Sequence, residues 1–187
     1  LSFVGELGWE IYIPIKKTNI IFNKIQKLGK KFNLTFAGMH TLDILRLEKK
    51  FLHWGHDITS ENNPLEAGLS FAVNFKKDTD FIGRRVLEKI KGAEPKKKLE
   101  LFSLKKNFIP GNPLLLHDEP LFYNEKIIGS TTSSNYSFCY KKNICLAYVD
   151  GGLKNYEDLS IEVEGKKYLL KHEKLPIHDP KSIMLRS

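Results

Sequence analysis

The acidic residue Glu10 is the clearest candidate in this chain for binding a ligand, because it lies in a segment that is predicted to be a strand. Residues 9–13 are rich in aromatic and β-branched side chains and stop at Pro14, which predicts a strand. Side chains alternate along a strand, so Glu10 and Tyr12 would share one face, with Trp9 on the other. A carboxylate is a planar pair of acceptors and can take two parallel hydrogen bonds from a flat heterocycle. The alternative is an ordinary surface glutamate on a half-exposed strand.

Two other groups contain metal-ligand residue types, but their spacing argues against a metal site. His53, His56 and Asp57 lie within five residues of each other, yet the two histidines lack the i, i+4 spacing of ligands on one helix face. Cys139 and Cys145 show no CxxC spacing and have no accompanying histidines. We therefore expect no metal, and two reduced structural thiols.

The net charge does not predict nucleic-acid binding, because the cations are scattered. The chain has 30 Lys and Arg against 22 Asp and Glu, a net charge of +8. The Lys and Arg residues form short runs at the ends of predicted elements, such as Lys96-Lys97-Lys98, instead of one basic stripe. Solvated surface is the expected explanation, and a field that attracts an anionic ligand is the alternative. No apolar stretch approaches the ~20 residues that span a bilayer, and we expect a cytoplasmic location.

The first half of the chain alternates strand-like and helical patterns, which predicts an α+β unit. Besides the segment at residues 9–13, a strand is expected over Ser70–Phe75. Apolar spacing predicts three helices. They run from an N-cap at Thr18 to Gly29, from Gly38 through a largely buried stripe that includes Leu42 and Leu47, and from a cap at Thr79 or Asp80 to Gly92, with Phe81, Val86, Leu87 and Ile90 packed inward.

The second half contains only short β-type runs after a polar linker at residues 93–98. Hairpin turns are expected at Asn124-Glu125 and Glu164-Gly165. Several short strands at this spacing indicate a small barrel or sandwich. The expected strands are Leu99–Leu104, Leu121–Tyr123, Lys126–Ile128, Ile144–Val149, Leu159–Glu164 and Tyr168–Leu170.

An ordered series of motifs resembles a known family. The motifs are Leu1-Ser-Phe-Val-Gly-Glu-Leu-Gly-Trp-Glu10, Leu45-Arg-Leu-Glu-Lys49, His53-Trp-Gly55, Asn63-Pro-Leu-Glu-Ala-Gly-Leu69, Asp80-Phe-Ile-Gly-Arg84, Gly129-Ser-Thr-Thr-Ser133 and Leu175-Pro-Ile-His-Asp-Pro180. Together they resemble the folate-binding part of the glycine cleavage T-protein (aminomethyltransferase) family, and in particular the C-terminal region of dimethylglycine and sarcosine dehydrogenases. The resemblance implies the C-terminal half of a T-protein-like α/β folate-binding domain (1–92), the linker, and an antiparallel β-barrel domain (99–187). Because Leu1 is not Met and enters a strand-like segment at once, we expect a longer parent polypeptide.

The resemblance also implies which side chains bind tetrahydrofolate. Glu10 would accept hydrogen bonds from the pterin, and Tyr12 shares its face. Phe3 stands where many T-proteins carry a Tyr, so it can stack on the pterin but supplies no hydroxyl. Trp54 would form an aromatic wall, and Arg186 would reach the glutamate tail of folate. Core packing is the alternative for Phe3 and Trp54.

Three positions depart from the T-protein pattern or have a structural explanation. Leu42 replaces an Arg that assists folate binding in many T-proteins, and dimethylglycine dehydrogenases are also apolar there. Arg46 is expected to be a buried, paired structural residue. The segment Gly129–Ser133 would face the pocket mouth, with Ser134 where relatives usually have Gly.

The function implied is the tetrahydrofolate-binding, one-carbon (methylene) transfer portion of a dimethylglycine or sarcosine dehydrogenase-like enzyme. FAD would belong only to the missing N-terminal flavin domain, and the catalytic carboxylate of the family lies upstream of Leu1, so no catalytic residue is assigned here. Besides folate, the partner would be a one-carbon unit from a methylated amine. The chain alone would be inactive. The alternatives are a stand-alone aminomethyltransferase with a lipoyl carrier partner, and a non-catalytic folate-binding remnant.

Overall fold

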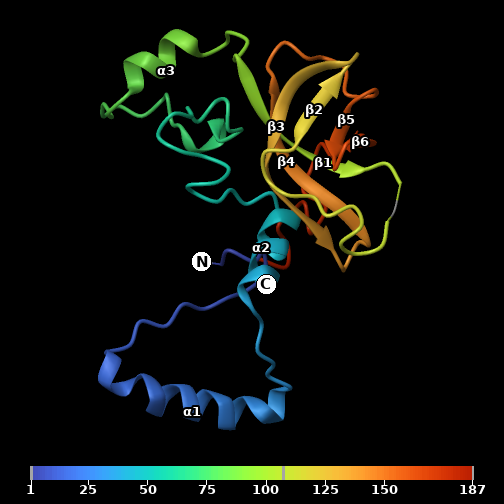
Figure 1. Ribbon diagram of the computed structural model, residues 1–187. Coiled ribbons are helices and arrows are strands. Elements are labelled where there is room, and N and C mark those ends of the chain that lie inside the picture. The colour runs from blue at the N-terminus through green and yellow to red at the C-terminus, as the bar shows by residue number, and fades with distance from the viewer. Residues whose placement is uncertain (1, 107, 187) are drawn as a thin grey trace.

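A closed antiparallel barrel forms the C-terminal half of the computed structural model, which describes residues 2–106 and 108–186. Its strands follow the order β1-β4-β3-β2-β5-β6 around the barrel (Figure 1). Their bounds are β1 (Lys97–Leu104), β2 (Pro120–Tyr123), β3 (Lys126–Ser137), β4 (Lys142–Asp150), β5 (Ser160–Val163) and β6 (Lys166–His172). The closed barrel confirms the α+β class and excludes the sandwich. β1 begins two residues inside the segment that was expected to be the linker.

Two tight turns set the register of the barrel hairpins, as the sequence predicts. Asn124 and Glu125 have φ of 47° and 63° and join β2 to β3, where Tyr123 pairs with Lys126. Glu164 and Gly165, at 51° and 72°, join β5 to β6. Two consecutive residues with positive φ match the twist of the strands that they connect.

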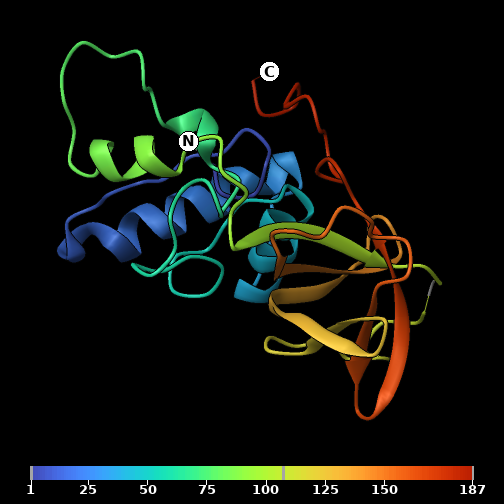
Figure 2. The ribbon, with the colours of Figure 1, turned by 90° about the horizontal axis from the view of Figure 1, so that it is seen from above.

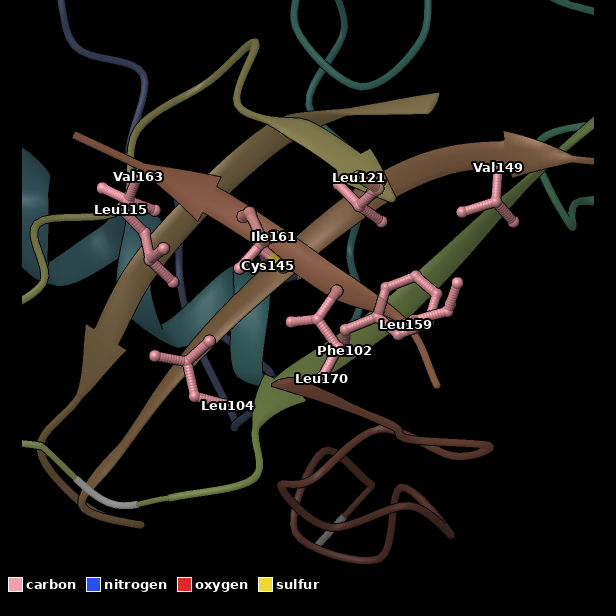
Figure 3. Close-up of a cluster of buried hydrophobic side chains, with 11 residues drawn as sticks. Phe102, Leu104, Leu115, Leu121, Cys145, Val149, Leu159, Ile161, Val163 and Leu170 are labelled. Carbon is pink, nitrogen blue, oxygen red and sulfur yellow. The ribbon is translucent and has the colours of Figure 1, made fainter. Parts of the chain in front are cut away.

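The barrel core consists of side chains that alternate along the strands. In β4, Cys145, Ala147 and Val149 belong to the interior cluster, whereas Ile144 and Leu146 belong to a second cluster on the other face. Figure 3 shows the interior side chains converging from several strands. The second cluster includes the fully buried Leu47 of helix α2. β4 is therefore buried on both faces, which explains its continuous apolar sequence.

The α-helices of the described residues lie to one side of the barrel (Figures 1 and 2). They are α1 (Thr18–Gly29), α2 (Met39–Glu48) and α3 (Arg84–Ile90). α1 stands apart on two extended segments in Figure 1 and has no buried residue. α2 is buried only in its last turn, whereas Met39 is 76% exposed, so the prediction of a largely buried helix was wrong for its first half.

Two predicted strands are absent from the described chain. Residues 8–14 are extended, but no described strand pairs with them, and Trp9 and Tyr12 are 86% and 90% exposed. An extended segment becomes a strand only when a neighbour accepts its backbone hydrogen bonds. Ser70–Ala72 forms a 3₁₀ turn instead of the strand expected from Ser70.

The helix ends also differ from the predicted ones. Thr18 is the first residue of α1 and not its cap, because Lys17 occupies the N-cap position without a side-chain bond. α3 begins only at Arg84, after Gly83 at φ 90°, while Asp80 accepts a hydrogen bond from the Phe81 backbone N–H. Of the α3 residues that were expected to pack inward, Val86 is 63% exposed.

Candidate functional site

Glu10 and Tyr12 lie together on the exposed extended segment before α1. The Tyr12 hydroxyl donates a hydrogen bond of 2.9 Å to Glu10 Oε2, so the two side chains share one face as the alternation predicts. The hydrogen bond to Glu10 and the negative charge of that carboxylate raise the pKa of the Tyr12 phenol. This hydrogen bond engages Oε2 and leaves Oε1 without a hydrogen bond to a described residue, although both side chains are exposed. Oε1 is therefore the oxygen that can accept from a ligand N–H.

Phe3 borders an apolar cavity near the end of α2. Its ring stacks on Phe51 with centroids 6.3 Å apart and meets the His53 ring edge-on at 6.2 Å. The cavity has a volume of about 600 Å³, within the range of small-molecule sites. Its lining consists of Phe3, Lys49, Lys50, Phe51, Leu52, Ile58, Ala67, Gly68, Leu69, Phe71, Pro176 and Ser182.

Trp54 and Arg186 are separate from this cavity. Trp54 is 66% exposed and forms an isolated β-bridge with Ile58. Arg186 is exposed in the last described turn, where its backbone N–H donates to the Ile183 carbonyl. A larger hollow of about 1150 Å³, bordered by residues 60–75 and 90–97, contains none of the five predicted folate-binding residues. The structure places these five on several surfaces and does not gather them into one cavity.

Arg46 is the centre of a buried polar cluster, which confirms its expected structural role. The residue is 1% exposed. Its guanidinium donates to Asp43 Oδ1 at 2.8 Å, to Ser133 Oγ at 2.7 Å and to Asp57 Oδ2. A buried guanidinium requires partners for its five donors, and here they come from α2, the following loop and β3.

Asp57 serves this cluster, although its histidine neighbours made it a metal candidate. Its Oδ2 also accepts from the His53 backbone N–H at 2.8 Å, and its Oδ1 accepts from the Thr132 hydroxyl at 2.6 Å. Among residues 2–106 and 108–186, no group of three His, Cys, Asp or Glu side chains is placed to hold a metal ion. Both oxygens of Asp57 are thus engaged by protein donors.

The segment Gly129–Ser133 is part of β3 and not a free turn. Its register shifts between Thr131 and Ser133, and this irregularity presents the Thr132 and Ser133 hydroxyls to Asp57 and Arg46. The sequence does not predict these contacts, because the residues that they join lie 75 and 87 positions apart. The available signal was the presence of charged residues, Arg46 among them, inside an apolar helical stripe.

The two cysteines have different environments. Cys145 is fully buried in the barrel, and burial raises the pKa of its thiol to about 12. Cys139 is exposed, and both are free thiols. Cys145 is a structural thiol, as expected, whereas Cys139 lies at the surface. No helix in the described parts of the chain is both long and apolar enough to cross a membrane.

Two family models match successive parts of the chain. The GCVT N-terminal domain matches residues 1–77, and the glycine cleavage T-protein C-terminal barrel domain matches residues 97–179. The second match coincides with the closed barrel. The first contains Glu10, Trp54 and most of the residues that line the cavity beside Phe3.

Proteins similar to this chain include enzymes that are much longer. Human "Dimethylglycine dehydrogenase, mitochondrial" is 34% identical over 171 residues, which are 90% of this chain and 19% of that protein. The aminomethyltransferase of Symbiobacterium thermophilum is 36% identical over 150 residues, 79% of this chain and 38% of that protein. The crystal structure of glycine cleavage system aminomethyltransferase T from Bartonella henselae shares the fold, with a TM-score of 0.75 at 23% identity over 87% of this chain and 45% of that one. From its two domains and these relatives, the chain belongs to the glycine cleavage T-protein family.

Proposed function

We propose that this chain is the tetrahydrofolate-binding, one-carbon transfer portion of a dimethylglycine or sarcosine dehydrogenase-like enzyme. The observation that carries the proposal is the similarity to human dimethylglycine dehydrogenase along 90% of the chain, across both domains. Because the chain spans only about a fifth of that relative, the amine substrate and a flavin-containing part belong to the same proposal. The cytoplasmic location stays a prediction, and the name of the human relative includes "mitochondrial".

The residues present fit a pterin in chemical type. The Glu10 carboxylate offers two coplanar acceptors for the parallel donors of the ring. The aromatic faces of Phe3 and Trp54 can cover a flat heterocycle, and the Arg186 guanidinium can pair with a carboxylate tail. Bound tetrahydrofolate would supply the nitrogen nucleophile that takes up the one-carbon unit. The contribution of this chain is to orient that ligand and exclude water from it.

This proposal assigns no proton-transfer residue within the chain. The predicted folate-binding side chains are spread over exposed segments, so further polypeptide must supply the remaining walls of the pocket. We therefore expect the isolated chain to bind tetrahydrofolate weakly or not at all, and to turn over neither dimethylglycine nor sarcosine. Turnover of either amine by the isolated chain would contradict this expectation.

A stand-alone aminomethyltransferase is the second candidate, because the Symbiobacterium enzyme is 36% identical over 79% of the chain. Two residues favour the dehydrogenase-like function instead. Leu42 is apolar where many T-proteins carry Arg, and Trp54 resembles the dehydrogenases in type. A dinucleotide-binding fingerprint in the upstream coding sequence would decide for the dehydrogenase, and its absence from a complete gene would decide for the transferase.

Titration calorimetry of tetrahydrofolate into the full-length protein tests the proposal. Glu10→Gln replaces one of the two acceptors by a donor, so we expect affinity to fall about 10- to 100-fold, as for loss of one charge-assisted hydrogen bond. Glu61→Gln is the matched control, because Glu61 is also exposed but borders the separate 1150 Å³ hollow. Equal affinities of wild type and Glu10→Gln would remove Glu10 from the proposed site.

A further inference from the structure

The opening segment, residues 2–8, is packed tightly against the residue that follows α2. Gly5 is buried with φ of 80°, and an added Cβ would lie 2.9 Å from both Cγ and Cδ of Lys49. The Lys49 side chain is 1% exposed, so its aliphatic stem lies across the glycine backbone. Only glycine allows this close approach and this backbone angle together.

Beyond Gly5, the same lysine reaches the C-terminal segment, which is defined here as residues 176–186. Its Nζ donates to the Asp179 carbonyl and lies 3.0 Å from Asp179 Oδ2. The Asp179 side chain is 7% exposed, and its Oδ1 accepts from the Ile183 backbone N–H at 2.8 Å. A shielded ion pair that is also fully hydrogen-bonded holds a fixed geometry, unlike an exposed one.

His178 makes a second connection between the same two segments. Its backbone N–H donates to the Glu48 carbonyl at 3.1 Å, at the end of α2. Its Nε2 lies 3.3 Å from Glu6 Oε1, and its Nδ1 lies 3.0 Å from the Tyr140 hydroxyl. The segments near both ends of the chain thus meet beside α2 (Figure 1).

We propose that Lys49 and Asp179 are positioning residues for folate binding. The C-terminal segment fixes residues 2–8 through this ion pair, and Glu10 extends from that fixed segment only two residues later. Residues 8–14 have no strand partner among the described residues. The position of the Glu10 carboxylate therefore depends on the packing of Gly5 against Lys49. Asp179 would therefore control folate affinity without touching folate, and Lys49, which lines the cavity beside Phe3, would do so through its contact with Gly5. The anchoring of residues 2–8 rests on geometry alone, whereas the effect on folate affinity rests on the proposed function.

The test uses the full-length protein with Lys49→Met, which keeps the aliphatic stem over Gly5 and removes the bonds to Asp179. Hydrogen exchange of residues 2–8 is measured beside calorimetric titration of tetrahydrofolate. We expect exchange of residues 2–8 to become about tenfold faster, unchanged protection of β4, and a 5- to 10-fold weaker affinity. Lys171→Met is the control, because Lys171 pairs at 3.1 Å with Glu173 after β6, lies outside the C-terminal segment and does not line the cavity beside Phe3.

The outcomes separate this inference from the proposed function. Unchanged exchange of residues 2–8 in Lys49→Met overturns the anchoring role. Faster exchange with unchanged affinity, while Glu10→Gln weakens binding, overturns the positioning role only. If Glu10→Gln binds as wild type does, the proposed function fails, whereas faster exchange still supports the anchor. Should Lys49→Met not fold, Asp179→Asn serves instead, because it removes the charge of the same ion pair and keeps the side-chain shape; exchange of residues 2–8 as slow as in wild type would again overturn the anchoring role.

Discussion

The barrel and the α1 region differ in how they use apolar side chains. In the barrel, Phe102 is completely buried among residues from several strands. In α1, Phe22 is 50% exposed and stacks only on Phe36 of the following extended segment, at 5.7 Å. Both regions have apolar residues at regular spacing, but only the barrel closes on itself. Regular apolar spacing can therefore produce a helix, as in α1, without any of its residues being buried.

Several large apolar side chains on α1 and on its two adjoining segments are exposed. Ile20 and Leu28 are 59% and 61% exposed, and Trp9 and Phe36 on the two adjoining segments are 86% and 67% exposed. Exposed apolar surface can mark an interaction site where it is contiguous. This agrees with the proposal that further polypeptide covers this region and completes the folate pocket.

The largest predicted effect comes from comparing a Phe→Ala substitution in the barrel with the same substitution in α1. Phe102→Ala should lower the free energy of unfolding by about 4 kcal/mol, because it leaves a cavity in a closed core. Phe22→Ala should cost less than about 1 kcal/mol, since the ring is already half in water. Urea unfolding of the two variants measures both values. Similar losses would mean that α1 is packed in solution and would break the comparison.

A second prediction concerns the joint between the helices and the barrel. Arg46→Met should destabilise the protein by about 3 kcal/mol, because Asp57 would stay buried without its charged partner. Arg85→Met, on the exposed face of α3, is the control and should change stability by less than about 0.5 kcal/mol. Thermal unfolding followed by circular dichroism would show the difference. If the Arg46 variant is as stable as the control, the cluster does not join the two regions energetically.

The smallest predicted effect is the pH-dependent contribution of Glu100 to the stability of the barrel. Burial raises the pKa of Glu100, but the hydrogen bond with His172 and the charge of Lys50 together lower it more, so the net pKa lies below the ordinary value. The stabilisation is therefore present above the unfolded-state pKa of about 4.3 and is lost as pH falls through the folded-state pKa. Glu100→Gln should cost about 1 kcal/mol at pH 7 and less at pH 3.5, measured by urea unfolding at both values. A loss that is equal at the two pH values would contradict the ionic role.

Local sequence patterns predicted most elements, including strands such as β1 whose pairing partners β4 and β6 are distant in the chain. The helix from Thr18 to Gly29, the six strand positions and both hairpin turns are confirmed. β3 is longer than expected, because Gly129–Ser137 lacks apolar alternation yet pairs with β4. The candidate site was predictable only in part. The face shared by Glu10 and Tyr12 follows from strand alternation, whereas a common pocket with Trp54 and Arg186 does not form within the described residues.

Sequence alone therefore determined the family, the element types and the residues that are candidates for ligand binding, because periodicity, turn residues and ordered motifs are local properties. Only the tertiary structure decided which of them meet. It brought Arg46 to Ser133 and Lys49 to Asp179, 87 and 130 residues apart, and it left residues 9–13 without a neighbouring strand in the part of the chain that the structure describes. The physical reason is that burial and backbone pairing depend on surfaces from distant segments, and no local pattern specifies those surfaces.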